Sequence, residues 1–266
     1  MKKKKRPVGL AVMIITLVFF YLPIVFVVIF SFNSSKSLTN FTGFSLTWYE
    51  KLFRDRNMME SLYTTILVAV VATAVSTVAG TMAAIGLSRS RKVVRDAVLQ
   101  INDFPVMNPE IVTAIGLMLF FIITGIKRGL LTMMLAHIAF CIPYVILSVM
   151  PKIRTMDPNL IDAALDLGCT PWQALWKVVV PEIRPGIVSG ALIAFTMSFD
   201  DFVISYFVTG RGVKNLSIMV YSLSKRVNPS INAVSTLVVV FITVALLIVN
   251  IIPLVKGRKK ERVENK

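Results

Sequence analysis

The stretch "RTMDPNLIDAALDLGCTPWQALWKVVVPEIRPG", residues 154–186, lies between two long apolar runs and has the pattern of a helical hairpin. Asp157–Pro158 predicts an N-cap followed by proline at the first helical position, and Gly168 is placed to end that helix. Thr170–Pro171 repeats the cap and the proline, and Pro181 is expected to stop the second helix. The stretch therefore predicts two short capped helices joined by a glycine turn, too short to form a domain.

Both helices of this hairpin are predicted to be amphipathic. In the first, Ile161, Ala164 and Leu165 share one face, and the two acids Asp162 and Asp166 share another. In the second, apolar residues follow the spacing i, i+3, i+4 and i+7, at Trp172, Leu175, Trp176 and Val179. Such a hairpin suits two positions: flat on a membrane surface, or in a groove of a partner protein with its apolar side chains as anchors.

The segments around the hairpin are typical of an integral membrane protein. Of the 266 residues, 56% are hydrophobic and only 16% are charged, against about 45–50% and about 25% in soluble domains. Six apolar runs have the length of about 20 residues that a membrane-spanning helix needs. The expected fold is all-α, a single domain over residues 8–255, with spans at Val8–Phe32, Leu62–Leu87, Val98–Thr124, Gly129–Met150, Gly186–Val208 and Asn232–Val255. Because Pro105 and Pro109 interrupt the third run, we expect it to be kinked or to begin as an interfacial helix.

The distribution of lysine and arginine predicts the orientation of these spans. Most of them lie in residues 1–7, in the loops 88–97 and 151–185, and in the tail 256–266. The positive-inside rule then puts both termini and the hairpin in the cytoplasm. The net charge of +15 is thus explained by topology, and nucleic acid is excluded as a partner. The first apolar run is too long for a signal peptide and is expected to be a retained span.

Two local patterns predict helix packing and a short outer helix. Small residues recur at every fourth position of the second span, at Ala72, Ser76, Gly80 and Ala84, which predicts close approach to another helix of this chain or of a second subunit. In the outer loop 31–61, Trp48, Tyr49 and Phe53 predict a short interfacial helix.

No residue pattern indicates catalysis or a metal site. The single histidine, His137, lies in an apolar run and is expected to be packed and hydrogen-bonded. No Gly-Lys dipeptide of a phosphate-binding loop occurs, and the chain offers no histidine and cysteine cluster. We therefore expect no cofactor or metal in this chain, and any ATP hydrolysis is expected to belong to a partner.

The hairpin resembles the cytoplasmic loop of the inner-membrane permeases of ATP-binding-cassette (ABC) importers. The loop of that family has the pattern E-A-A-x3-G-x9-I-x-L-P. This chain matches its spacing throughout, with Asp162-Ala163-Ala164, Gly168, Val178 and Val180–Pro181. The resemblance implies the type I ABC importer permease fold and coupling helices that sit in a cleft of a cytoplasmic ATPase. It also implies coupling roles for Asp162, Ala163, Ala164, Gly168, Trp172, Leu175, Trp176 and Pro181.

Other stretches are similar to the C-type permeases of spermidine/putrescine importers. These are "SFNSS" (31–35), "HIAFCIPYV" (137–145), "DAALDLGCT" (162–170) and "SFDDFVISYFVTG" (198–210). The resemblance implies a multi-pass subunit of the bacterial inner membrane with a second permease, two copies of an ATPase and an extracytoplasmic polyamine-binding protein as partners. Permeases for iron, sulfate or other solutes share the loop pattern, so another small solute stays open. The sequence also leaves open which polyamine is preferred and whether the second permease is a copy of this chain or a different protein.

Two adjacent acids, Asp200 and Asp201, lie in the apolar fifth run. Each costs about 2.5–3.5 kcal/mol at the centre of a membrane helix. On a straight helix Asp200 lies 14 residues after Gly186, about 21 Å along the axis and so in the outer half of the membrane. The pair then faces away from an aromatic stripe and toward the protein interior or water; the stripe consists of Phe195, Phe199, Phe202 and Tyr206.

Three interpretations of the pair remain open. One aspartate caps a helix break or pairs with a cation such as Lys127 or Arg128; the pair contacts the binding protein at the outer mouth; or the pair lines the route and attracts a cationic substrate. Glu110, after Asn108–Pro109, is a further candidate for substrate binding. Two alternatives come from other functional classes. An ATP-independent secondary transporter or cation channel would use the same acids as proton or cation relays. A non-transporting membrane anchor for a cytoplasmic partner would leave the buried acids unexplained.

Overall fold

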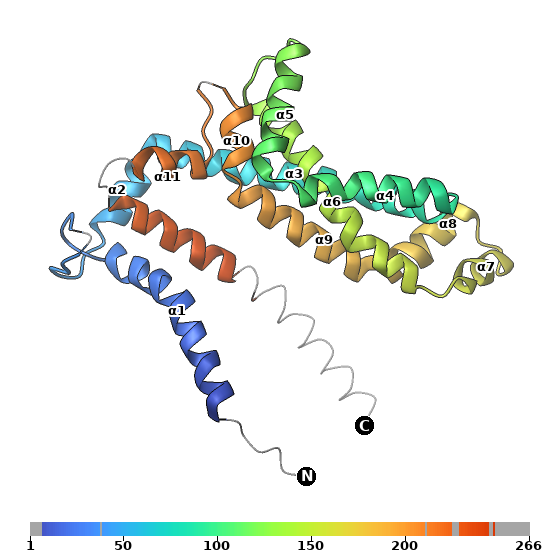
Figure 1. Ribbon diagram of the computed structural model, residues 1–266, viewed down its shortest axis with the longest axis horizontal. Helices are drawn as coiled ribbons and strands as arrows, with labels where there is room; N and C mark the ends of the chain where they lie inside the picture. The colour runs from blue at the N-terminus through green and yellow to red at the C-terminus, as the bar shows by residue number, and fades with distance from the viewer. Residues whose placement is uncertain (1–6, 38, 211, 225–228, 245–246, 248–266) are drawn as a thin grey trace. The chain divides into compact units, whose positions relative to one another are not determined.

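The computed structural model describes residues 7–37, 39–210, 212–224, 229–244 and 247, and these are mostly helical (Figure 1). The basic segment 1–6, the end of the sixth predicted span and the tail 256–266 lie outside the described residues. Within them, the one β-type pairing is an isolated bridge between Asn33 and Phe44. The named helices are α1 (Pro7–Ser31), α2 (Thr47–Arg54), α3 (Arg56–Ser88), α4 (Lys92–Met107), α5 (Glu110–Ile123), α6 (Leu130–Thr155), α7 (Asn159–Asp166), α8 (Pro171–Ala174), the π-helix η1 (Leu175–Val179), α9 (Val180–Asp200), α10 (Val203–Val208) and α11 (Leu216–Ser224).

The apolar helices agree with five of the predicted spans. Among the described residues, α1, α3, α6 and the continuous run Pro171–Asp200 are each long and apolar enough to cross a membrane. Helices α4 and α5 meet this condition only together, as a broken span or a re-entrant loop with a bend of 105°, so the expected interruption of the third run is confirmed. A shorter apolar helix, Ser230–Val244, covers part of the sixth predicted span. The chain is a multi-pass, all-α membrane protein.

The chain forms two compact units, one of residues 1–59 with 220–266 and one of residues 60–219. In the first unit, Asn33 organises the loop after α1. Its Nδ2 donates to the carbonyl of Asn40 at 2.9 Å, and its Oδ1 accepts from the N–H of Thr42 at 2.9 Å. The predicted short outer helix is confirmed as α2. Trp48 of α2 is buried and donates from Nε1 to the carbonyl of Asn33 at 2.7 Å.

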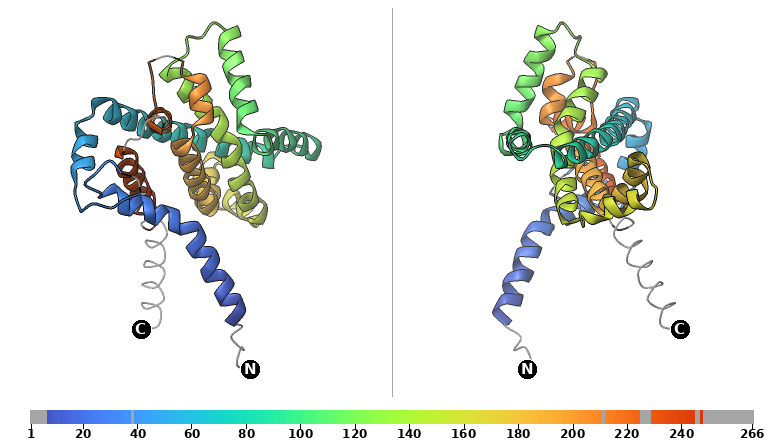
Figure 2. Two further views of the ribbon diagram at one scale, coloured as in Figure 1. Left: turned by 60° about the vertical axis from the view of Figure 1, so that its left-hand side comes forward. Right: turned by 90° about the vertical axis from the view of Figure 1, so that its right-hand side faces the viewer.

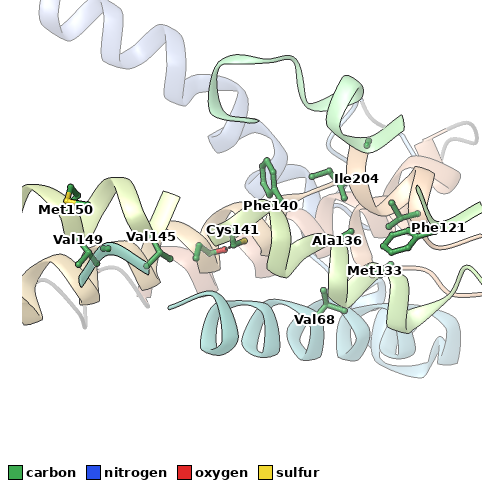
Figure 3. Close-up of a cluster of buried hydrophobic side chains, with 14 of the residues drawn as sticks. Val68, Phe121, Met133, Ala136, Phe140, Cys141, Val145, Val149, Met150 and Ile204 are labelled. Atoms are coloured by element: carbon green, nitrogen blue, oxygen red, sulfur yellow. Dashed lines mark hydrogen bonds between the residues drawn. The ribbon is translucent and has the colours of Figure 1, made fainter. Parts of the chain in front are cut away.

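In the second unit, α6 is the central helix. Helix α9 runs alongside α6 in both Figure 1 and Figure 2, and α4 and α10 also contact α6. Helix α5 packs against α10 rather than against α9. The buried side chains of α6 form most of the hydrophobic cluster in Figure 3, and α3, α5 and α10 add the rest that is labelled there. This core fixes the positions of the helix ends that form the site described below.

Small residues allow α3 and α9 to approach α6 on either side of Val145. A Cβ atom added to Gly80 of α3 would lie 2.7 Å from the Cβ of Val145, and one added to Gly190 of α9 would lie 3.3 Å from its Cα. The predicted small-residue stripe of α3 therefore serves packing within the chain. Helix α9 carries a second stripe with the same spacing, which our sequence analysis missed: Gly186, Gly190, Ala194 and Ser198.

Two expectations for the fifth span are wrong. Pro181 does not stop a helix, because η1 inserts a π turn in which the N–H of Val180 donates to Leu175 five residues earlier. The turn shifts the hydrogen-bond register, so Pro181 falls in the first turn of α9, where its missing N–H costs little. The helix then ends at Asp200 instead of continuing to Val208. The second helix of the hairpin is thus the beginning of the long helix that ends at the acids.

Candidate functional site

Two helices of the second unit are broken, and a candidate acid lies at each break. The break between α4 and α5 is at Asn108–Pro109, because a residue before proline is disfavoured in the helical conformation. Glu110 begins α5 directly after it. The break between α9 and α10 follows Asp200, where Asp201 is extended with φ −63° and ψ 126°. Because α5 packs on α10 and the charges of both aspartates act on Glu110, the two breaks belong to one region.

The structure brings the three predicted acids into one electrostatic cluster. The charges of Asp200 and Asp201 both act on Glu110, and the charge of Glu110 acts on the phenol of Tyr144 on α6. Glu110 and Asp200 are exposed, and Tyr144 is partly exposed. The accessible part of the cluster is therefore a pair of carboxylates from two different helix ends, beside an aromatic ring.

Asp201 differs from its neighbour because its carboxylate is used inside the protein. The residue is 7% exposed. Its Oδ1 accepts from the N–H of Ile204 at 3.1 Å, and its Oδ2 accepts from the N–H and the hydroxyl of Ser205 at 2.7 and 2.8 Å. Asp201 therefore caps the first turn of α10, which matches the interpretation that one aspartate caps a helix break. Among the described residues, Lys127 and Arg128 form no ion pair with either aspartate.

The expected single aromatic stripe is wrong, because it assumed one straight helix. Phe195 and Phe199 stack on α9 with their centroids 5.6 Å apart. Phe202 and Tyr206 lie after the break, with their ring centroids 5.4 Å apart. Phe199 is buried and does not face lipid.

His137 of α6 lies beside the break and is packed and hydrogen-bonded, as predicted. Its Nδ1 is 2.7 Å from the hydroxyl of Ser198, and its Nε2 is 2.9 Å from the hydroxyl of Ser205. Its Nε2 also lies 3.3 Å from Oδ2 of Asp201. Within the described residues, no group of three or more metal-ligating side chains occurs.

Asn215, before α11, completes this polar network. Its Nδ2 donates to the carbonyl of Asp201 and to the hydroxyl of Ser205, both at 2.8 Å, and its Oδ1 accepts from the N–H of Ile218 at 2.9 Å. Ser198, Ser205 and Asn215 were not among the residues predicted from the sequence. The available signal was the presence of serines three and four residues from Asp201 in an apolar run.

The predicted hairpin forms a second candidate site, at the other end of α9. The N-cap role of Asp157 is supported by its Oδ1, which accepts from the N–H of Asn159 at 2.9 Å. Gly168 has φ +84°, and hydrogen bonds from Gly168 to Leu165 and from Cys169 to Ala164 complete a Schellman motif. The second predicted cap is confirmed as well: the N–H of Gln173 donates to Thr170 Oγ1 at 3.3 Å, and the N–H of Thr170 donates to Gln173 Oε1 at 3.0 Å.

The apolar residues of the hairpin do not share one buried face. Ala164, Ala174 and Val179 are buried, whereas Trp172 and Trp176 are 67% and 54% exposed and contact each other edge to face at 5.6 Å. The expected stripe from Trp172 to Val179 is therefore divided, because the π turn rotates Val179 away from the tryptophans. Leu167, in the turn before them, is 87% exposed; we call these three exposed apolar residues of the hairpin the hairpin surface.

Comparisons with known proteins agree with this architecture. Residues 76–255 match the family model of the binding-protein-dependent transport system inner membrane component. The chain is 36% identical over 242 residues to the putrescine transport system permease protein PotI of Escherichia coli (strain K12), with 88% of this chain and 86% of the relative covered. It is 34% identical over 241 residues to the spermidine/putrescine transport system permease protein PotC of Haemophilus influenzae, with 90% and 93% covered.

Solved structures show the same fold at lower sequence identity. A chain of a bacterial ABC transporter involved in the import of the acidic polysaccharide alginate superposes with a TM-score of 0.71 at 16% identity, covering 95% of this chain and 98% of that chain. A chain of the MetNI methionine ABC transporter superposes with a TM-score of 0.58 at 22% identity, covering 74% and 97%. The fold is therefore that of ABC importer membrane subunits, which by itself does not decide the solute.

Proposed function

Because this chain belongs to the family of binding-protein-dependent transport system inner membrane components, we propose that it is the permease subunit of an ATP-driven polyamine importer. Relatives with 33–36% identity over most of the chain are named as putrescine or spermidine/putrescine permeases, which supports the solute. The observation that carries the proposal is the exposed carboxylate pair of Glu110 and Asp200 at two helix breaks.

The acid cluster has the charge that a polyamine requires. Polyamines carry several ammonium groups, and carboxylates that lie close together repel one another until a cation neutralises them. The helix breaks add carbonyl groups at the C-terminal ends of α4 and α9, and such carbonyls favour cations. Tyr144, within electrostatic reach of Glu110, provides an aromatic surface on which a cation can bind.

The hairpin surface suits docking to an ATPase. Leu167, Trp172 and Trp176 are exposed, although hydrogen-bonded caps hold the backbone around them in a defined shape. Exposed aromatic residues on a rigid support are typical anchors at protein interfaces. The complex would contain two copies of the ATPase, a second permease and an extracytoplasmic polyamine-binding protein. Both termini and the hairpin would face the cytoplasm of a bacterium, as the lysine and arginine distribution predicts.

A single helix connects the two candidate sites. From Pro171 to Asp200 the helical backbone is uninterrupted, with η1 as its one π segment. From Trp176 to Asp200 it extends about 36 Å at about 1.5 Å per residue. A movement imposed by the ATPase at the tryptophans would therefore reach Asp200 through one element, with α6 packed along it. Rigid-body motion of this kind is sufficient for alternating access.

Purification of the native complex tests the proposal. The subunits that co-purify are identified, and ATP hydrolysis by the reconstituted complex is measured with putrescine, spermidine and uncharged or anionic solutes. We expect an ATPase among the subunits and stimulation by the amines alone. Stimulation by a different solute would support the role as an importer subunit and would exclude polyamines as the transported solute. Uptake that persists without any associated ATPase would instead favour a secondary transporter or channel.

The hairpin surface has its own test. Trp172→Ala and Trp176→Ala are expected to reduce the amount of ATPase that co-purifies, whereas Lys177→Ala, at an exposed position of the same segment, is the matched control. Crosslinks from Trp172 or Asp162 should reach the ATPase. Normal ATPase recovery with both tryptophans replaced would exclude the hairpin surface as the docking site.

A further inference from the structure

We propose that His137 is a positioning residue for Asp200: acting through Asp201, it holds the broken end of α9 so that the Asp200 carboxylate faces the solute route. The inference rests on the proposed function, because it assigns a purpose to the exposed carboxylate. His137 and Asp201 do not themselves face the solute route, because they are only 1% and 7% exposed.

The imidazole bridges the two sides of the break. Ser198 belongs to the last turn of α9, whereas Ser205 belongs to α10. The ring of His137 contacts both hydroxyls, at 2.7 and 2.9 Å, from the neighbouring helix α6. A helix interrupted in an apolar environment leaves backbone groups without partners, so such a break persists only where side chains hold it. Asp201 and Asn215 bond backbone groups at this break, and His137 links the serine hydroxyls on its two sides from outside the broken helix.

The hydrogen atoms of the network assign a role to each ring nitrogen. The Ser205 hydroxyl donates to Asp201 at 2.8 Å, so its single hydrogen is used, and it must accept from both His137 Nε2 and Asn215 Nδ2. The Asn215 amide orientation is fixed independently, since its Oδ1 accepts from the N–H of Ile218. His137 therefore carries its hydrogen on Nε2, and in the neutral ring Nδ1 accepts from Ser198.

In this arrangement both carboxylate oxygens of Asp201 are bonded within the protein and are not available to a solute. Three donors from Ile204 and Ser205 occupy its oxygens within 3.1 Å, and His137 Nε2 lies at 3.3 Å from Oδ2. The Asp201 carbonyl in turn accepts from Asn215 at 2.8 Å. With the side chain and the backbone of Asp201 both held, the direction of the preceding residue, Asp200, is held as well.

Accessibility of position 200 provides a direct test. In a complex with Cys169→Ser, Asp200→Cys is the target of a cationic thiol reagent, since Cys141 is fully buried. The rate of modification is compared in the presence of His137→Gln, which keeps a donor on its terminal nitrogen, and of His137→Leu, which keeps none. Ser148→Ala is the matched control, because it removes a different hydrogen bond between α6 and α9, to the carbonyl of Gly186 at 3.2 Å.

We expect His137→Leu to change the rate by about threefold or more, which is within the range for residues that share one hydrogen-bond network. His137→Gln should restore part of the change, and Ser148→Ala should have no effect. An unchanged rate in an assembled His137→Leu complex would overturn the proposal. If that variant does not assemble, Ser198→Ala, which removes the partner of the other ring nitrogen, is judged by the same criterion.

Uptake kinetics separate positioning from a general structural role. If His137 affects uptake by positioning Asp200, His137→Leu raises the KM for putrescine when Asp200 is present. It then has no further effect on the KM in the Asp200→Asn background. Equal effects in both backgrounds would contradict the proposal. If Asp200→Asn leaves uptake unchanged while His137→Leu still alters the modification rate, the solute role of Asp200 fails and the positioning role of His137 stands.

Discussion

Asp200 and Asp201 are adjacent in the chain, yet Asp200 ends α9 with an exposed side chain and Asp201 is buried under α10. The divergence arises because the backbone leaves the helical conformation at Asp201, with ψ 126°. One carboxylate is available to a solute, and the other has its hydrogen bonds satisfied by Ile204 and Ser205. The same substitution at the two positions should therefore have different consequences.

Asp200→Asn is expected to reduce polyamine uptake without affecting assembly. Removing the charge from a carboxylate that binds an ammonium group costs about 1.5–3 kcal/mol, or about tenfold to a hundredfold in apparent affinity. Glu110→Gln should act in the same direction, because the two charges interact. The measurement is the concentration dependence of putrescine uptake in proteoliposomes. Wild-type kinetics for both variants would exclude these acids as solute ligands.

Asp201→Asn is expected to lower stability instead. An amide presents one oxygen and a donor group, so one of the N–H groups of Ile204 and Ser205 loses its acceptor, at a cost of about 1–3 kcal/mol. Thermal unfolding of the purified complex measures the loss, with Asp200→Asn as the control that should leave the midpoint unchanged. If the two variants were equally stable, the capping role assigned to Asp201 would be incorrect.

Gly80→Ala tests the close approach of α3 to α6. The new Cβ would lie 2.7 Å from the Cβ of Val145, so the helices must separate, at a cost of about 1–3 kcal/mol. Gly86→Ala, on the same helix, meets nothing within 4 Å and is the control. Val145→Gly removes both side-chain atoms that the new Cβ would meet, Cβ at 2.7 Å and Cγ1 at 2.8 Å, so Gly80→Ala should cost less in the Val145→Gly background in the same unfolding measurement. A Gly80→Ala complex as stable as the Gly86→Ala complex would contradict the packing described here.

Gly168→Ala tests the turn of the hairpin. The backbone there has φ +84°, which costs about 1–2 kcal/mol for a residue with a Cβ, although no atom blocks that Cβ. We expect uptake per ATP hydrolysed to fall, because the turn that joins the two docking helices distorts. Gly168→Asn should retain more coupling, since asparagine tolerates this conformation better. Equal coupling in the two variants would show that the conformation of Gly168 does not matter.

Asn33→Ala is expected to loosen the loop after α1. The Asn33 side chain holds Asn40 and Thr42, with bonds of 2.9 Å each, and no alanine can replace these bonds. Limited proteolysis should therefore cut residues 34–46 faster than in the wild type. Ser45→Ala, which removes contacts to the hydroxyl and the N–H of Thr47 and no bond of Asn33, is the control. Unchanged protection would mean that Asn33 is not the centre of this loop.

The amino-acid sequence by itself determined the features that depend on neighbouring residues. The spans follow from hydropathy, because burying each backbone in lipid requires a continuous apolar helix. The caps of the hairpin follow from Asp157, Gly168 and Thr170, whose hydrogen bonds reach only a few residues along the chain. The break at Pro109 was predictable for the same reason, since proline acts on the residue before it.

Only the tertiary structure decided the break after Asp200, the different environments of the two aspartates and the orientation of His137. No proline or glycine marks that break in the sequence. His137 forms hydrogen bonds with the hydroxyls of Ser198 and Ser205 on either side of the break, and these are 61 and 68 residues away in the chain. These residues become neighbours only when α9 packs on α6 through the glycines of α9. Local sequence patterns do not predict that contact.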